Sequence, residues 1–192
     1  MDEMIRTITE KIEELAAQGR RVTVAIDGRC ASGKSTLADA LAERLGCAVF
    51  RTDDYFLRPE QRTPERFASP GGNLDRERLL DEVILPLERG ERTVAHRAFD
   101  CKTMTMTPPV ETKVGNVAIV EGSYSCHPDL WDRYGLHVFL TLSPEEQMRR
   151  ITAREGEAAA EIFRQKWIPL EEEYFKAYRV SERCDLCFST DV

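Results

Sequence analysis

The chain has 192 residues, of which 42% are hydrophobic and 32% charged, and its formal net charge is −7. This length suits one α/β domain with its own core, and the acidic balance, without clustered lysine and arginine, excludes a nucleic-acid surface and favours a small-molecule partner. No apolar stretch reaches membrane-spanning length and the first residues are acidic rather than a secretory leader, so we expect no membrane contact, a cytoplasmic location and reduced thiols, with a homo-oligomer left open.

The first elements lead into a phosphate-binding motif. Apolar residues spaced by three and four over residues 2–18 predict an amphipathic helix within an N-terminal segment 1–19. The apolar run Val22–Ile26 then predicts a strand, and it is followed by Gly28-Arg29-Cys30-Ala31-Ser32-Gly33-Lys34-Ser35, which fits G-x-x-x-x-G-K-[ST]. A strand, this loop and a helix in that order predict a P-loop that binds a nucleoside triphosphate.

The roles within the loop follow from the chemistry of a triphosphate. Glycines allow the backbone N–H groups to approach the phosphates, and the helix beginning near Gly33 directs its positive end at them. We expect Lys34 to reach the β and γ phosphates and Ser35 to ligate Mg²⁺. The predicted nucleotide-binding residues are Gly28, Ala31, Ser32, Gly33, Lys34, Ser35 and Thr36.

Two aspartates follow the next predicted strand. Helix 34–45 is closed by Gly46, and a short strand near residues 47–51 runs into Thr52-Asp53-Asp54. Such a β-α-β start predicts a parallel sheet whose carboxyl ends share one rim, so the P-loop and these aspartates meet there. Adjacent carboxylates of an extended segment point in different directions, and we favour Asp53 over Asp54 as a catalytic base, or as a metal ligand, with a solvated acidic loop as the alternative.

The middle of the chain predicts a cover for this rim. Residues 58–73 are predicted to be a long loop that touches substrate, residues 74–89 a helix, and residues 93–107 an extended hairpin that ends at Pro108-Pro109, within a segment 93–110. Residues 117–120 and 137–142 are typical of buried parallel strands. Glu121 ends the first of these, where it would reach Mg²⁺ through water or orient substrate; a glutamate in solvent is the alternative.

The last third of the chain carries arginines on a helix. Ser143-Pro144-Glu145-Glu146 predicts a helix start with a capping box. Arg150 and Arg154 share one face of that helix and would close over the phosphates, with an ordinary solvated charged face as the alternative. A further helix over 157–179 is expected to kink or break at Pro169, and the last strand is expected at 184–190.

The order of these motifs resembles a known family. The P-loop, Thr52-Asp53-Asp54-Tyr55-Phe56, Val120-Glu121-Gly122, and Arg149-Arg150-Ile151 before Arg154 are similar to the uridine kinase and phosphoribulokinase family of P-loop kinases. The resemblance implies an α/β P-loop NTPase fold with a five-stranded parallel core sheet flanked by helices, MgATP as donor and Asp53 as base. It also implies an arginine-bearing lid, here at 149–157, and a hairpin, here at 93–110, that covers the acceptor.

The same comparison predicts where the acceptor binds. Its residues would be Asp54, Tyr55, His96, Arg97 and Phe99. The chain has Phe67-Ala68-Ser69-Pro70 where uridine kinases carry a Phe-Asp-His-Pro-like element, and His96-Arg97 add a cation, which indicates a more anionic or differently shaped acceptor.

Three functions are open on the sequence. The first is an ATP-dependent phosphotransferase with an alcohol acceptor, most simply a nucleoside; Lys34, Asp53, Arg150 and Arg154 would be its catalytic residues. Kinases of the ribosylnicotinamide or pantothenate type are the next alternatives to a nucleoside kinase. A regulatory nucleotide-binding ATPase and a ligand-binding relative without activity are the others, although no Asn-Lys-x-Asp element of a GTPase switch occurs. The acceptor and the preference for ATP over GTP are undetermined.

Overall fold

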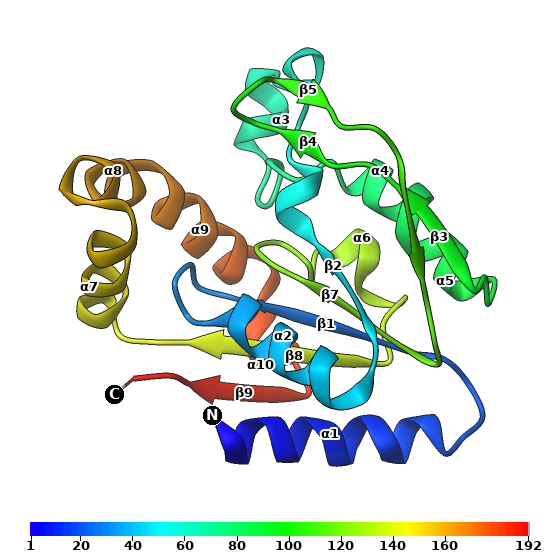
Figure 1. Cartoon of the computed structure of the whole chain (residues 1–192). Coiled ribbons are helices and arrows are strands. Elements are labelled where there is room, and N and C mark those ends of the chain that lie inside the picture. Colours follow the sequence, from blue (N-terminus) through cyan, green and yellow to red (C-terminus); the bar gives the residue numbers. More distant parts are fainter. Residues whose placement is uncertain (192) are drawn as a thin grey trace.

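A parallel β-sheet forms the centre of the molecule. The computed structural model describes residues 1–191, and within them five parallel strands form this sheet, in the order β2-β7-β1-β8-β9 (Figure 1). The predicted five-stranded parallel core sheet is confirmed. The strands are β1 (Val22–Gly28), β2 (Ala48–Arg51), β7 (Val117–Glu121), β8 (Leu136–Thr141) and β9 (Leu186–Ser189).

The sheet register brings the functional loops to one rim. Ile26 of β1 lies beside Glu121 of β7, and Glu121 in turn lies beside Arg51 of β2. Because the strands are parallel, their carboxyl ends lie on the same side. The loop after β1, the turn after β2 and the end of β7 therefore adjoin each other.

Helices cover both faces of the sheet because the side chains of the buried strands alternate. Val24 and Ile26 of β1 pack with α1 (Asp2–Ala16) and α2 (Lys34–Leu45). Ala25, between them, faces the opposite core. That core includes residues of α4 (Arg76–Leu79), α5 (Leu85–Glu88), α6 (Pro128–Trp131), α9 (Ile168–Tyr178) and α10 (Val180–Arg183).

Two helical segments widen into a π-helical turn immediately before a proline-containing turn. Residues 76–88 run through α4, the π-turn Leu80–Ile84 and α5, which contains Pro86. Likewise α8 (Glu157–Ile162), the π-turn Phe163–Trp167 and α9 lead to Pro169. A proline has no N–H to donate and its ring crowds the preceding turn. The kink or break predicted at Pro169 is thus replaced by a wider turn through which the helix continues.

The loop over residues 58–73 and the hairpin that starts at residue 93 differ in detail from prediction. Residues 58–73 contain the 3₁₀ turn Pro59–Gln61 and the helix α3 (Pro64–Ala68). The hairpin continues beyond Pro108-Pro109, because these prolines, which lack N–H groups, lie between two paired sections instead of ending the hairpin. In the outer section β4 (Phe99–Asp100) pairs with β5 (Thr105–Met106), and in the inner one β3 (Thr93–His96) pairs with β6 (Val110–Lys113).

The arginine-bearing helix α7 (Pro144–Glu155) begins where predicted, with half of the expected capping box. The Ser143 hydroxyl accepts the Glu146 N–H at 3.4 Å. The Glu146 carboxylate binds Arg149 and Arg150 instead of returning to Ser143, whose N–H donates to Asp191. None of the helices within residues 1–191 is long and apolar enough to cross a membrane.

Candidate nucleotide and acceptor site

The P-loop backbone requires glycine at its first position. Gly28 has φ +138°, and a Cβ atom there would lie 2.0 Å from the carbonyl oxygen of Leu140 on the neighbouring strand. Gly33, at φ +90°, begins α2, and Ala31, at φ +62°, also adopts a left-handed conformation. These positions turn the chain from β1 into α2 and set the concave shape that wraps an anion.

Lys34 lies folded over this loop. Its ammonium donates to the carbonyl oxygens of Gly28 at 2.7 Å and Arg29 at 2.9 Å, and the side chain is largely buried. The lysine is therefore held against the backbone of the loop.

Two glutamates fasten the loop to helix α9. Glu171 accepts the Cys30 N–H at 3.0 Å and the Ser123 hydroxyl at 2.6 Å. Glu172 forms a two-point ion pair with Arg29, at 2.6 and 3.0 Å. Sequence reasoning missed both residues because no local spacing marks which glutamate of a charged helix meets a loop more than 140 positions away.

Asp27 is a buried carboxylate directly below the loop. It accepts N–H groups of Gly28 at 2.7 Å and Cys126 at 3.0 Å, and the Tyr174 hydroxyl at 2.8 Å. Burial raises the pKa of Asp27 to about 6, against the lowering effect of these donors and of Lys34. Its one sequence signal was an acid at the end of an apolar strand, which the prediction did not use.

Glu121 lies at the rim between the loop and the end of β2. It is buried, and it contacts the Ser35 hydroxyl at 3.4 Å and the Arg51 guanidinium at 2.5 Å. Burial raises the pKa of Glu121, and the ion pair with Arg51 opposes this effect. The alternative of a strand-end glutamate in solvent is thereby excluded.

The two aspartates after β2 lie in a 3₁₀ turn, Thr52–Tyr55, rather than in an extended segment. This turn still gives the two side chains different surroundings. Asp53 is exposed and lines a cavity at the P-loop, whereas Asp54 is half-buried and does not line it. Burial raises the pKa of Asp54, and nearby His96 opposes the shift.

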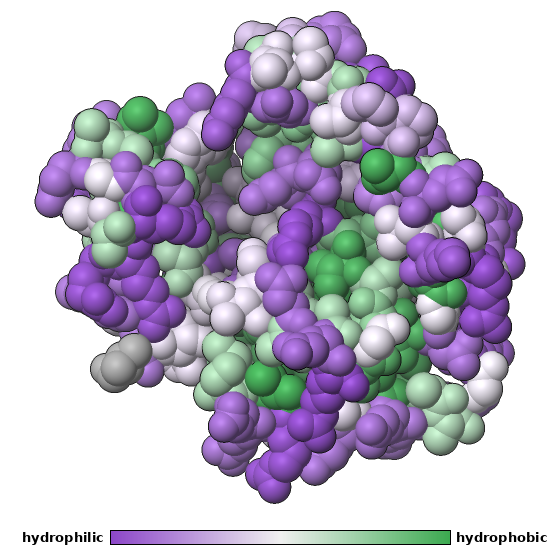
Figure 2. Space-filling model, viewed as in Figure 1, coloured by the Kyte–Doolittle hydropathy of each residue, from purple (hydrophilic) through white to green (hydrophobic). Residues whose placement is uncertain are grey.

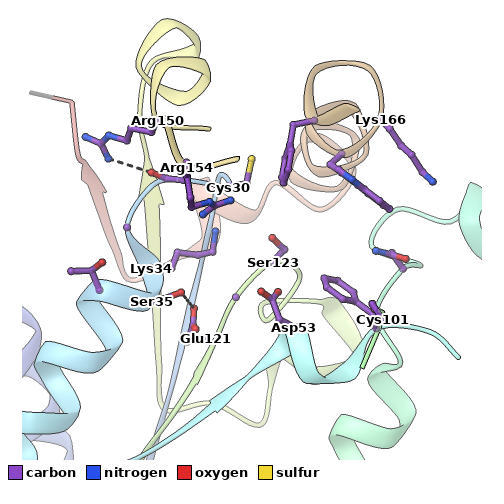
Figure 3. A pocket seen from close by; sticks show the side chains of 18 of the residues that line it. Cys30, Lys34, Ser35, Asp53, Cys101, Glu121, Ser123, Arg150, Arg154 and Lys166 are labelled. Atoms are coloured by element: carbon purple, nitrogen blue, oxygen red, sulfur yellow. Dashed lines mark hydrogen bonds between the residues drawn. The ribbon is translucent and has the colours of Figure 1, made fainter. Parts of the chain in front are cut away.

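This cavity has a volume of about 700 Å³, within the range of small-molecule sites. Figure 2 shows a hollow between the lobe that contains α7 and α8 and the lobe that contains α3. In the close-up, Lys34, Ser35 and Glu121 lie at one side, with Arg150 and Arg154 above them, while Asp53, Cys101 and Lys166 extend the site to the other side (Figure 3). We call these sides the P-loop end and the distal end.

The predicted nucleotide-binding and lid residues mostly meet at the cavity. Its lining includes Ala31, Gly33, Lys34, Ser35, Thr36, Arg150 and Arg154, but not Gly28 or the buried Ser32. Arg150 is tied by hydrogen bonds to Glu146, Ala31 and Thr190, whereas Arg154 is exposed and contacts Glu155.

All five residues predicted to bind the acceptor, Asp54 among them, lie outside the cavity lining. Tyr55 is fully buried under the Arg78 guanidinium, 4.2 Å from the ring centroid, and Phe99 is also buried. His96 hydrogen-bonds Thr112, and Arg97 donates to the Thr107 carbonyl, so both serve the hairpin. The distal lining, which the sequence did not reveal, comes instead from Phe56, Arg62, Phe67, Asn73, Cys101, Lys166 and Trp167.

Fold and site together define an α/β protein of the P-loop NTPase class, with carboxylates placed at the ends of the strands beside the loop. Within that class, the sequence model of the family described as AAA domain (AAA_18) matches residues 24–166, and the chain belongs to this family.

Curated relatives with related sequences are larger proteins. The chain is 28% identical to the bifunctional pantoate ligase/cytidylate kinase of Prochlorococcus marinus (strain MIT 9313), over 74% of this chain and 33% of that protein. A protein of the same description from Synechococcus sp. (strain WH7803) is 30% identical, over 74% of this chain and 34% of the relative. The chain thus spans about a third of the length of these relatives.

Solved structures share the fold over nearly the whole chain. A possible uridine kinase from Bacillus stearothermophilus superposes with a TM-score of 0.65 at 21% identity, covering 95% of this chain and 99% of the other. Phosphoribulokinase from Rhodobacter spheroides superposes with a TM-score of 0.61 at 11% identity, covering 90% and 71%. The resemblance to uridine kinase and phosphoribulokinase predicted from the motifs is confirmed at the level of the fold.

Proposed function

We propose that the protein is an ATP-dependent kinase that transfers the γ-phosphate to a hydroxyl group of a small molecule. The observation that carries the proposal is the Asp53 carboxylate, which lines the same cavity as the P-loop lysine. Within residues 1–191 it forms neither a salt bridge nor a hydrogen bond, whereas Glu121 is engaged by Arg51. A free carboxylate facing a phosphate site is available to accept a proton.

The remaining groups suit phosphoryl transfer, which depends on positioning and on neutralising charge. Lys34, Arg150 and Arg154 supply positive charge at the P-loop end. As the acceptor oxygen attacks the γ-phosphorus, its proton passes to Asp53, the new P–O bond forms, and the bond to the β-phosphate oxygen breaks to release ADP. Helix α2 stabilises the phosphates with its N–H groups.

The donor set at the rim fits Mg²⁺. Ser35, Glu121 and Asp53 all line the cavity and offer hydroxyl and carboxylate oxygens, the hard ligands that Mg²⁺ prefers. Ser35 and Glu121 would hold the ion, directly or through water, with Asp53 beside them. The bound ion would neutralise charge on the β and γ phosphates.

A second acceptor class is favoured by the curated relatives, which are described as bifunctional pantoate ligase/cytidylate kinases. In this version the acceptor is a nucleoside monophosphate and the attacking atom is one of its phosphate oxygens. Such an oxygen is already ionised at neutral pH, so this reaction needs no general base.

The first test measures ADP formation from MgATP with nucleosides, nucleoside monophosphates, ribosylnicotinamide, pantothenate and sugar phosphates, each against a reaction without acceptor. Stimulation by one acceptor, together with its phosphorylated product, supports the kinase. Equal ADP release with and without every acceptor contradicts it and favours a regulatory ATPase.

A substitution at the base separates the two acceptor classes. With a hydroxyl acceptor, Asp53→Asn should lower kcat by about 10²–10⁴-fold while ATP affinity is retained, because proton removal is lost. Asp54→Asn is the matched control, since Asp54 does not line the cavity. A small effect of Asp53→Asn would indicate a phosphate acceptor, and a collapse with Asp54→Asn alone would move the base to Asp54.

A further inference from the structure

The cavity carries positively charged side chains at both ends. Those at the P-loop end are bound by carbonyl or carboxylate oxygens, whereas those at the distal end form no salt bridge within residues 1–191. At the P-loop end, Lys34 is held by two carbonyl oxygens, Arg150 pairs with Glu146, and Arg154 pairs with Glu155. At the distal end lie Arg62 and Lys166. In the part of the chain that the structure describes, neither of these two forms a salt bridge.

Arg62 is fixed in place by its uncharged surroundings. Its Nε donates to the Leu57 carbonyl at 2.9 Å, and the guanidinium carbon lies 5.9 Å from the centroid of the Phe99 ring. The thiol of Cys101 lies beside the guanidinium, which opposes the rise in the pKa of this thiol caused by burial. These contacts orient the planar guanidinium, while its charge is left without a carboxylate.

Lys166 approaches from the opposite wall. It belongs to the π-turn Phe163–Trp167, and its ammonium lies 4.4 Å from the centroid of the Trp167 ring. Figure 3 shows Lys166 on the side of the cavity away from Lys34. A cation on a flexible, exposed side chain at the mouth suits capture of an incoming anion.

The walls between these cations suit an organic ligand rather than a bare ion. Phe56, Phe67 and Trp167 line the cavity with apolar surface. Asn73 also lines it, and its side-chain amide makes no hydrogen bond to any of residues 1–191. A molecule with an apolar body and polar ends would use all of these groups.

We infer that the phosphate acceptor is an anion, a carboxylate or a phosphate monoester, whose charged group is bound by Arg62 and Lys166 while its hydroxyl lies at Asp53. This inference rests on the proposed function and names its substrate class. An anion would form an ion pair with each of these two cations, which a neutral acceptor cannot do. His96 and Arg97, the cations expected from the sequence, lie outside this lining, so the positive charge comes from other residues.

The experiment compares acceptors that differ chiefly in charge. Pantothenate is paired with pantothenol and ribose 5-phosphate with ribose, which distinguishes the carboxylate from the phosphate source. Steady-state kinetics are measured for the unaltered protein, Arg62→Gln and Lys166→Gln. Lys176→Gln serves as control, because Lys176 is exposed on α9 and does not line the cavity.

We expect the anionic member of at least one pair to be the better acceptor. Arg62→Gln and Lys166→Gln should each raise its KM about tenfold or more, with a smaller change in kcat and none in the KM for ATP. Added salt should raise the same KM, most strongly for the unaltered protein. Preference for the neutral member of each pair, or a KM that neither substitution moves, overturns the anionic acceptor and leaves the kinase standing.

Acceptor-independent ADP release would contradict the kinase itself, and a binding measurement then decides on the anion site. The protein, saturated with MgADP to fill the P-loop, is titrated calorimetrically with pantothenate and with ribose 5-phosphate. Binding that Lys166→Gln weakens and Lys176→Gln does not supports an anion site. Absence of binding by both probes overturns it.

Discussion

Replacing Asp27 by asparagine tests the electrostatics beneath the P-loop. Burial raises the pKa of this carboxyl from 3.8 to about 6. Between pH 3.8 and about 6, the folded protein therefore keeps on Asp27 a proton that the unfolded chain has lost. At about 1.4 kcal/mol per pKa unit, the difference corresponds to about 3 kcal/mol of unfolding free energy.

The sign of this effect is fixed by proton binding. Because the folded state binds more protons in this window, the Asp27 contribution to stability grows as pH falls from 7 toward 4 and is lost as pH rises through about 6. The asparagine side chain of the Asp27→Asn variant would not titrate. Its oxygen would still accept the hydrogen bond from the Gly28 N–H, but its NH₂ would face the Cys126 N–H, and both are donors. The lost hydrogen bond should cost about 1–3 kcal/mol of unfolding free energy, independent of pH.

The assay is urea unfolding of both proteins at pH 7, 6, 5 and 4 and constant ionic strength, without nucleotide. The native protein should gain about 2 kcal/mol relative to Asp27→Asn between pH 7 and pH 4, because the unfolded carboxyl is already partly protonated at pH 4. Subtraction removes the other titrating groups, which both proteins share. Parallel pH profiles would refute the reasoning, since they would mean that Asp27 titrates alike in the folded and unfolded states.

Three further substitutions test the loop and the rim. Gly28→Ala should destabilise the fold by about 3 kcal/mol or more in urea unfolding, because its Cβ would lie 2.0 Å from the carbonyl oxygen of Leu140. The control is Gly90→Ala, which should cost only about 1 kcal/mol because Gly90 has φ +77° and open space around it. Equal losses would contradict the steric argument. Lys34→Ala should abolish nucleotide turnover with an unchanged circular dichroism spectrum, and retained turnover would defeat the P-loop assignment. Arg51→Met should cost about 1–3 kcal/mol in urea unfolding, because it leaves the buried Glu121 without its cation, and an unchanged midpoint would show that the pair contributes nothing.

The sequence predicted the elements whose cause is local. Helix 34–45 was predicted with the bounds that α2 has, because a loop of fixed composition begins it and Gly46, at φ +62°, ends it. The buried strands followed from their apolar runs, and the parallel order from the β-α-β start. The rule that a proline kinks or ends a helix failed at Pro169. There a π-turn precedes the proline and lets the helix continue.

The amino-acid sequence by itself therefore determined the P-loop, the parallel sheet and the rim where Asp53 and Glu121 meet the loop, because glycine geometry, strand period and crossover handedness are properties of short segments. The tertiary structure decided what the rest of the cavity is made of. Tyr55 and Phe99 became core, while Arg62 and Lys166, about a hundred positions apart, came to line one cavity. Asp27 likewise met Tyr174, 147 residues away, only through packing of α9 against the sheet. Such contacts depend on how the helices pack on the sheet. That packing is determined by burial and by polar pairing over the whole chain, which no local sequence pattern encodes.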